Sequence, residues 1–216
     1  MNIKRITFWG LFIIILGLIM WGLVVAMNKP TTGSSLLSPA PISTSDHVTG
    51  PAKAPVTIIE YGDFECPACG LYFPFVERLL GEASTTVRLV FRHFPLPQHA
   101  NAMITGEASE AAALQGKFWD MYRIIYEHQN DWSNLADAHL VLDGYAEKIG
   151  LDMTKFKADL DSSAVKESVL ADLAEGEKIG IDQTPTFFVN GKAITNPQGY
   201  EAFKSLIEAA ASGSSK

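Results

Sequence analysis

An uncharged hydrophobic stretch near the N-terminus divides the sequence into two unlike parts. It runs from residue 6 to residue 27 and contains no charged side chain. As a helix it would be about 33 Å long, enough to cross a hydrocarbon core of about 30 Å. Lys4 and Arg5 precede it, so the positive-inside rule places residues 1–5 in the cytoplasm. We therefore predict a single-pass anchor over residues 6–27 and an extracytoplasmic domain after it.

A cleaved signal peptide is the alternative for this stretch. Its apolar region would have about 7–15 residues and would be followed by a cleavage site of small residues. The uncharged stretch is longer, and Val25-Ala26-Met27 ends in Met at the place of such a site. Both interpretations send the remaining chain out of the cytoplasm.

Composition separates a linker from a domain in the rest of the chain. Residues 28–50 are rich in Ser, Thr, Pro and Gly, which predicts a flexible linker. Residues 51–216 hold 14 basic and 23 acidic side chains, and the whole chain has a net charge of −7. Nucleic-acid binding needs a basic surface, so we expect no nucleic-acid partner.

Residues 51–216 show the pattern of an α/β fold. Strands are predicted where β-branched and apolar residues run together: residues 56–61, 87–94, 186–190 and, after an Asn-Gly hairpin signal, 192–195. Helices are predicted where apolar residues recur at helical spacing: residues 67–80, 100–115, 118–128, 135–149, 165–179 and 200–211. The helix over 67–80 can act as the crossover that a parallel first pair of strands requires. The helical block over about 99–180 then forms an insertion.

The two cysteines lie three positions apart at the start of the first predicted helix. Cys66 is expected at the N-cap, and Pro67 suits the first helical turn because its missing N–H is not needed there. Free N–H groups and the helix dipole stabilise a thiolate at this position and lower its pKa. Cys69 lies one turn later, within reach to resolve a mixed disulfide. The arrangement favours reversible dithiol–disulfide chemistry.

Three other interpretations of the cysteines remain open. A structural disulfide would close a loop of about four residues and stabilise the fold by only about 1.9 kcal/mol. A zinc site would need two further ligands, for which His93 and His99 are available. The third possibility is a pair of inert thiols.

Four features of the sequence, in order, resemble the DsbA-like family of extracytoplasmic thiol-disulfide oxidoreductases. They are the segment Phe64-Glu65-Cys66-Pro67-Ala68-Cys69, Pro74 in the following helix, the helical block, and Thr184-Pro185-Thr186. The resemblance covers about residues 50–211. It implies a thioredoxin fold with a helical insertion over about 99–180, here preceded by a transmembrane helix.

The resemblance also implies roles for individual residues. Cys66 attacks a disulfide or is attacked by a substrate thiolate, and Cys69 resolves the mixed disulfide. The disulfide Cys66–Cys69 is the redox-active group, and the resemblance implies no metal or organic cofactor. Glu60 matches a buried acid whose raised pKa suits proton exchange with Cys69. The bond between Thr184 and Pro185 is expected to be cis, so that the Thr184 backbone can pair with an extended substrate.

Two residues depart from DsbA itself. Ala68 stands where DsbA has a histidine, and the carboxylate of Glu65 beside Cys66 opposes thiolate formation. Both differences weaken stabilisation of the reduced form. We therefore expect a weaker oxidant than DsbA.

The implied substrates are unfolded or reduced cysteine-containing polypeptides. The implied recycling partner is a membrane redox protein, either a quinone-linked oxidase or a thiol reductant. Three alternatives stay open: a disulfide isomerase or reductase with the same site, a thioredoxin-fold module that binds metal or acts as a chaperone, and a purely structural membrane-tethered interaction domain. Reduction potential separates the first alternative from an oxidase. Metal binding without dithiol exchange would favour the second.

Overall fold

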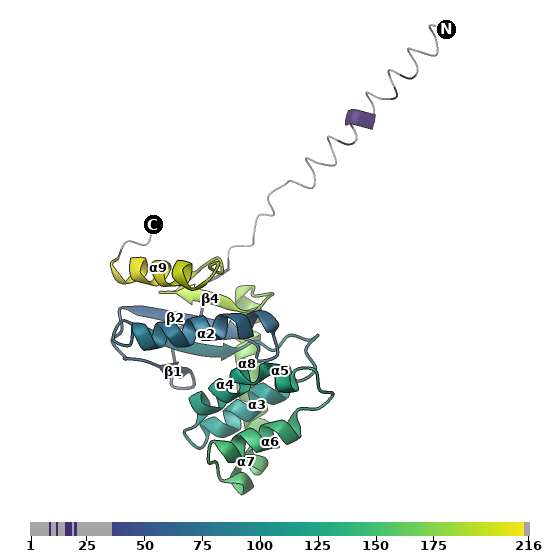
Figure 1. Cartoon of the computed structure of the whole chain (residues 1–216), viewed down its shortest axis with the longest axis vertical. Helices are drawn as coiled ribbons and strands as arrows, with labels where there is room; N and C mark the ends of the chain where they lie inside the picture. Colours follow the sequence, from purple (N-terminus) through teal and green to yellow (C-terminus); the bar gives the residue numbers. More distant parts are fainter. Residues whose placement is uncertain (1–8, 10–11, 13–15, 19, 21–35, 214–216) are drawn as a thin grey trace. The chain divides into compact units, whose positions relative to one another are not determined.

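The computed structural model describes residues 36–213 together with residues 9, 12, 16–18 and 20 (Figure 1). The chain divides into one unit of residues 1–35 and another of residues 36–216. The predicted anchor over residues 6–27 lies largely outside the described residues. Among those that are described, no helix has both the length and the apolar character needed to cross a membrane.

A five-stranded mixed sheet forms the centre of the second unit. Its strands are β1 (His47–Thr49), β2 (Val56–Gly62), β3 (Val87–His93), β4 (Thr186–Val189) and β5 (Lys192–Ala193). The order in the sheet is β1-β3-β2-β4-β5, with β2 and β3 parallel and the other neighbours antiparallel. The helix α2 (Pro67–Glu82) connects the parallel pair, as the crossover argument predicts. Asn190 and Gly191, both with positive φ, form the predicted hairpin.

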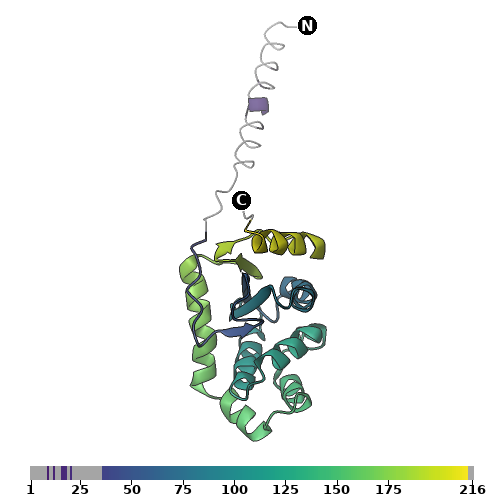
Figure 2. The same cartoon turned by 90° about the vertical axis from the view of Figure 1, so that its left-hand side faces the viewer.

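Helices cover both faces of the sheet. α2 and α9 (Tyr200–Ala211) lie on one face, and α8 (Ser163–Ile179) lies on the other (Figure 2). Alternate strand residues point to opposite faces of the sheet and form one core on each face. The core beneath α2 and α9 includes Val56, Ile58, Leu89 and Phe187. The core near the end of α8 includes Ile59, Tyr61, Val90 and Phe188. Strands covered on both faces explain why apolar residues run on without alternating.

The insertion is helical, as predicted, but it contains two more short helices than the sequence indicates. Its elements are α3 (Ala102–Ala113), α4 (Phe118–Glu127), α5 (Gln129–Trp132), α6 (His139–Lys148), α7 (Met153–Leu160) and α8. The helices α5 and α7 were not expected. The core of the insertion includes Phe64, Cys69 and Phe73, so the start of α2 lies between the sheet and the insertion.

The prediction of a flexible linker over residues 28–50 is wrong for residues 36–50. Residues 47–49 form β1, which pairs antiparallel with β3. The Leu37 N–H donates to the Ile179 carbonyl oxygen at 3.1 Å, and the Asp46 carboxylate accepts from Arg92 at 2.7 Å. This segment is too polar to fold by itself, and it is ordered by contacts with a domain formed elsewhere in the chain. Residues 28–35 lie outside the described residues.

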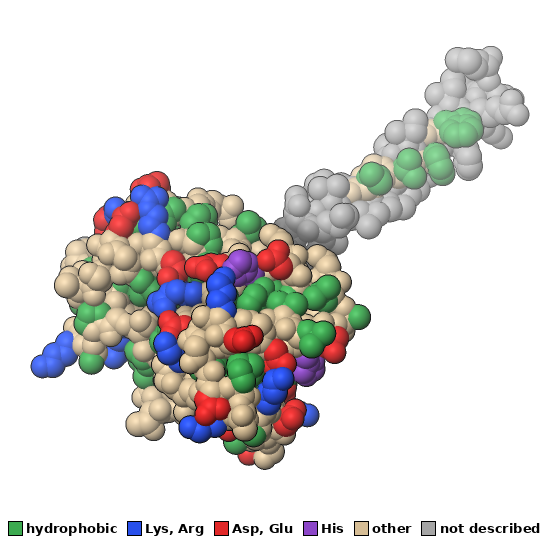
Figure 3. Space-filling model, turned by 60° about the horizontal axis from the view of Figure 1, so that its bottom comes forward, with side chains coloured by type: hydrophobic (Ala, Val, Ile, Leu, Met, Phe, Trp, Pro, Cys, Tyr) green, Lys and Arg blue, Asp and Glu red, His purple; other side chains and the backbone are tan. Residues whose placement is uncertain are grey.

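The surface of the domain mixes charges of both signs. Figure 3 shows acidic, basic and apolar side chains interspersed over one face of the described surface, rather than gathered into a single basic area. Pairs of opposite charge are common on this surface, such as Lys117 with Asp120 and Lys157 with Asp143.

Candidate active site

The two cysteines lie where the sequence predicts, at the N-terminus of α2. Cys66 is the N-cap residue, Pro67 is the first residue of the helix, and Ala68 follows it. No disulfide joins Cys66 to Cys69 in this structure. Cys66 retains 6% exposure and Cys69 none, so the first cysteine is the more accessible but is not the freely exposed group that the sequence suggests.

The two sulfurs have opposite electrostatic environments. The pKa of Cys66 is lowered to about 5, chiefly because the Cys69 thiol donates a hydrogen bond to its sulfur. Burial opposes this lowering, whereas the Thr184 side chain and the backbone N–H groups of Ala68 and Cys69 reinforce it. Burial raises the pKa of Cys69 well above its usual value. At neutral pH the pair therefore holds one thiolate, on Cys66, and one thiol, on Cys69.

Glu60 is a buried acid, as the resemblance implies. It lies in β2 between Phe91 of β3 and Phe187 of β4, with 1% exposure. Its pKa is raised to about 8, first by burial and then by the charge of Cys66. Among the described residues, nothing hydrogen-bonds to its Oε2 atom. Glu60 also raises the pKa of Cys69, so the two acidic groups lie close enough to interact.

The loop before β4 approaches the cysteines from the other side. The peptide bond between Thr184 and Pro185 is cis, as expected from the resemblance. The Thr184 carbonyl oxygen lies 3.4 Å from the Cys66 sulfur, and Thr184 is 8% exposed. Cys66 therefore has a backbone acceptor beside it from a segment more than 100 residues away in the sequence.

Asp63 holds the active-site segment in a way that the sequence does not reveal. Its carboxylate accepts hydrogen bonds from the Glu65 N–H at 2.8 Å, the Leu96 N–H at 2.9 Å and the His99 ring at 2.6 Å. Its own N–H lies 3.5 Å from the Cys69 sulfur. Only the position of Asp63, three residues before Cys66, could have drawn attention to it.

Gln129 of α5 supports the same segment from the insertion. Its Nε2 atom donates to the carbonyl oxygens of Phe64 at 2.7 Å and Cys66 at 2.9 Å. These two carbonyl groups flank Glu65, whose own carboxylate accepts a hydrogen bond from the Asn101 N–H at 2.5 Å. No local sequence signal points to Gln129, because its partners lie more than 60 residues earlier.

The two histidines considered as zinc ligands with the cysteines are engaged elsewhere. His93 lies 3.0 Å from the Glu110 carboxylate, and His99 pairs with Asp63. Each imidazole therefore has a carboxylate partner within the domain.

Comparisons with known proteins agree with this geometry. The sequence profile of a family described as thioredoxin matches residues 43–209. The structure of BdbD from Bacillus subtilis in its oxidised form is similar, with 27% identity, a TM-score of 0.70, and coverage of 83% of this chain and 100% of that one. The structure of alpha-DsbA1 from Wolbachia pipientis shares the fold, with 21% identity, a TM-score of 0.69, and coverage of 81% and 94%.

Relatives with higher identity carry another name. The Na(+)/H(+) antiporter NhaA 1 of Salinispora arenicola is 40% identical over 169 residues, and the NhaA of Herminiimonas arsenicoxydans is 39% identical over 168 residues. Each match takes in 78% of this chain, which spans only about a quarter of the relatives' length, 25% and 26%. The similarity therefore concerns one part of those proteins. Because the thioredoxin profile spans most of this chain, the chain belongs to the thioredoxin family.

Proposed function

We propose that this chain is a protein thiol-disulfide oxidoreductase that exchanges disulfides with cysteine-containing polypeptides through Cys66 and Cys69. The observation that carries the proposal is the contrast between the two sulfurs. Cys66 has a pKa lowered to about 5 at a helix N-terminus, whereas Cys69 is fully buried and its pKa is raised. A thiolate is both the better nucleophile and the better leaving group, so exchange is directed to Cys66.

In the oxidising direction, a substrate thiolate attacks the Cys66 sulfur of the Cys66–Cys69 disulfide. The bond between the two cysteines breaks, a mixed disulfide forms, and Cys69 leaves with the electron pair as a thiolate. A second substrate thiolate then attacks the substrate sulfur of the mixed disulfide. The substrate gains a disulfide, and Cys66 is released as the stabilised thiolate.

Glu60 supplies the proton that Cys69 needs in this sequence. With a pKa of about 8, its carboxyl group holds a proton at neutral pH, in contrast to an ordinary glutamate. Transfer of that proton to the Cys69 thiolate avoids an uncompensated buried charge. In the reverse direction Glu60 takes the proton back, which allows Cys69 to attack the mixed disulfide.

Thr184 and Pro185 are the proposed contact for the substrate backbone. The Thr184 carbonyl oxygen already lies beside the Cys66 sulfur. An extended polypeptide whose cysteine reaches Cys66 would pass this loop and could pair with it as an added strand. Such recognition uses main-chain groups and therefore accepts many sequences.

We also propose that the domain works outside the cytoplasm, held to a membrane by residues 6–27. The uncharged length of that segment and the preceding Lys4 and Arg5 support this proposal. Anchoring would raise the local concentration of a membrane redox partner, either a quinone-linked oxidase or a thiol reductant.

Trapping of mixed disulfides tests the function directly. The Cys69→Ser variant, incubated with a reduced unfolded polypeptide and oxidised glutathione, should accumulate a covalent complex through Cys66 that a reducing agent releases. Cys66→Ser should form no such complex and should show no turnover. Unchanged oxidation of the substrate by Cys66→Ser, with circular dichroism confirming its fold, would refute the proposed role.

The reduction potential decides the direction of net electron flow. A Cys66 pKa of about 5 lies between the values typical of DsbA, about 3.5, and thioredoxin, about 7. We therefore expect a potential between about −120 and −270 mV, nearer the middle of this range than either end. Equilibration of the chain in glutathione buffers measures it. A value below about −250 mV would favour a reductase with the same site.

A further inference from the structure

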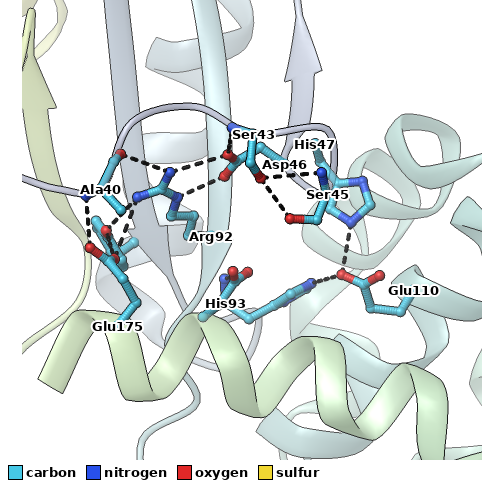
Figure 4. A network of polar contacts seen from close by, with 11 residues as sticks. Ala40, Ser43, Ser45, Asp46, His47, Arg92, His93, Glu110 and Glu175 are labelled. Carbon is cyan, nitrogen blue, oxygen red and sulfur yellow. Dashed lines mark hydrogen bonds and ion pairs between the residues drawn. The ribbon is translucent and has the colours of Figure 1, made fainter. Parts of the chain in front are cut away.

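Two imidazole rings and a carboxylate meet where β1, β3 and α3 come together (Figure 4). Nε2 of His47 lies 2.7 Å from Oε1 of Glu110, and Nε2 of His93 lies 3.0 Å from the same oxygen. The three ligand atoms all lie within 4.8 Å of one another. We refer to these residues as the His47–His93–Glu110 cluster. It includes neither cysteine and has no part in the exchange chemistry proposed above.

The cluster is held rigidly by packing. His93 is 2% exposed, and the side chains of Glu110 and His47 are 9% and 15% exposed. The His47 ring stacks on Phe118 with the ring centres 3.5 Å apart and the planes within 6°. Each residue comes from a different element, so the fold itself directs both Nε2 atoms to one carboxylate. A ligand that binds there would require little further ordering of side chains.

In the described part of the chain, the Glu110 carboxylate has no partner with a permanent positive charge. Among the described residues, Glu110 is paired only with the two histidines and with no lysine or arginine. Asp172 of α8 accepts the His93 N–H at 2.9 Å and forms no ion pair with a lysine or arginine in the described part of the chain. The nearby Arg92 is paired with Asp46 instead. Within the described residues the buried Glu110 carboxylate thus has no lysine or arginine partner, which is unfavourable for a buried charge.

The types of ligand indicate which cation would fit. Two imidazole nitrogens and a carboxylate oxygen are the ligands of zinc and related transition metals. Calcium and magnesium prefer sites made wholly of oxygen. We propose that the His47–His93–Glu110 cluster binds one divalent transition metal ion of the Zn²⁺ type. Without metal the same groups are held by hydrogen bonds; for a metal to bind both Nε2 atoms, each neutral imidazole must carry its proton on Nδ1 instead.

The position of the cluster suggests a stabilising role. The metal would tie β1, at the N-terminal end of the domain, to both the sheet and the insertion. The Phe64 ring of the active-site segment lies 5.9 Å from the His93 ring, so the site also supports that segment. Binding to the folded state alone raises stability in proportion to the logarithm of the metal concentration.

Metal titration of a thiol-free chain tests this proposal. The full chain carrying Cys66→Ser and Cys69→Ser removes the thiolates, which would themselves bind zinc. After treatment with a chelator, Zn²⁺ is titrated by calorimetry, Co²⁺ by visible absorption, and thermal unfolding is followed with and without Zn²⁺. We expect one Zn²⁺ per chain, Co²⁺ bands typical of nitrogen and oxygen ligands, and a higher Tm with Zn²⁺.

Variants then locate the ion. His47→Gln and Glu110→Gln in the thiol-free chain should each weaken Zn²⁺ binding at least about 10-fold and abolish the rise in Tm. His139→Gln is the matched control, because His139 also pairs with a carboxylate, that of Asp137, but on the surface. It should bind Zn²⁺ as the thiol-free parent does. If Glu110→Gln fails to fold, His47→Gln decides, because His47 lies near the surface on a three-residue edge strand.

Two results would overturn the proposal. One is the absence of stoichiometric Zn²⁺ uptake by the folded, thiol-free chain. The other is uptake that His47→Gln leaves unchanged, which would place the ion elsewhere. In either case the His47–His93–Glu110 cluster would be a hydrogen-bonded contact only, and the proposed oxidoreductase function would stand unaffected.

Discussion

The sulfur of Cys66 lies 3.4 Å from the backbone carbonyl oxygen of Thr184, although 118 positions separate the two residues in the sequence. This contact brings the start of α2 against the loop that precedes β4. A polypeptide that approaches the sulfur meets a backbone acceptor at the same moment. The contact therefore joins the chemical group of the site to the surface proposed to receive the substrate.

The first prediction concerns the reactivity of Cys66. Because its pKa is lowered to about 5, alkylation of the reduced chain by iodoacetamide should follow a thiolate titration with a midpoint near pH 5. Cys69 should stay unmodified at neutral pH, since it is fully buried and its pKa is raised. The rate measured against pH, with mass spectrometry to identify the modified residue, provides the check. Faster alkylation of Cys69 would mean that the two roles are reversed.

Cys69→Ala provides a sharper form of the same experiment. The largest lowering of the Cys66 pKa comes from the hydrogen bond donated by Cys69, and alanine removes the donor. The alkylation midpoint should therefore move upward, toward the value of about 8.5 for an unperturbed cysteine. The urea-unfolded chain serves as the reference, because both thiols should titrate near that value. A midpoint that stays near 5 would assign the lowering to the helix and the Thr184 loop alone.

The second prediction is a pH-dependent effect of Glu60→Gln on stability. The pKa of Glu60 is about 8 in the folded state and 4.5 as an ordinary side chain, so the folded state holds the proton more tightly. The contribution of Glu60 to stability is therefore complete below about pH 4.5 and is lost as the pH rises to about 8. At about 1.4 kcal/mol per pKa unit the loss approaches about 5 kcal/mol, an upper bound. Glutamine has no such dependence.

Urea unfolding of the oxidised chain tests this, because thiol titration does not contribute there. The difference in the free energy of unfolding between Glu60→Gln and the parent should grow from about pH 4.5 up to the folded-state pKa of Glu60, which burial alone raises in the oxidised chain, and stay flat outside that window. The same variant should slow exchange with a reduced polypeptide, since Cys69 loses its proton donor. Parallel stability curves would show that Glu60 is solvated, and unchanged exchange rates would remove its role in proton transfer.

The third prediction concerns the ion pairs that hold residues 36–46 to the sheet. The side chain of Arg92 is 5% exposed and binds the Asp46 carboxylate at 2.7 Å, with Glu175 at 3.4 Å on its other side. Arg92→Met leaves buried acceptors without their cation and should cost about 3–5 kcal/mol of unfolding free energy. It should also expose residues 36–46 to limited proteolysis.

Arg78→Met is the matched control for this effect. Arg78 pairs with Glu82 at 2.7 Å, the same distance, but its side chain is 54% exposed. An exposed pair of this kind contributes less than about 1 kcal/mol. If both arginine variants lose similar amounts of free energy, the buried network around Arg92 is not what fastens residues 36–46.

Sequence reasoning succeeded where the decisive contacts are local. Hydrophobic runs predicted β2 and β3 to within about a residue at each end, and Asn190-Gly191 predicted the hairpin. The Cys66 cap followed from a strand that leads directly into a helix, whereas the burial of Glu60 was expected from the family resemblance. Reasoning from the residues alone favours a trans bond before Pro185, and only the resemblance to the DsbA-like family reversed that expectation.

Sequence reasoning failed where a residue's contact partner is distant in the sequence or where the helix or strand is short. The sequence predicts linker over residues 46–49 because the partners of Asp46 and His47, which are Arg92 and Glu110, follow 46 and 63 residues later. The helix α5 has four residues, too few to show a period. For the same reason of distance, the sequence did not link His47 to His93 or Gln129 to the active-site segment.

The last prediction couples Gly70 to Gln129. A Cβ atom at Gly70 would lie 2.3 Å from Oε1 of Gln129, the side chain whose Nε2 donates to the carbonyl oxygens of Phe64 and Cys66. Alanine favours a helix over glycine by about 1 kcal/mol, but here it displaces Gln129 and breaks both hydrogen bonds. Gly70→Ala should therefore destabilise the parent by about 1–2 kcal/mol, whereas in a Gln129→Ala background it should be neutral or stabilising. Urea unfolding of the four chains gives the coupling energy. Purely additive effects would show that Gln129 moves aside without loss, and that its contact with the Cys66 carbonyl does not hold the active-site segment in place.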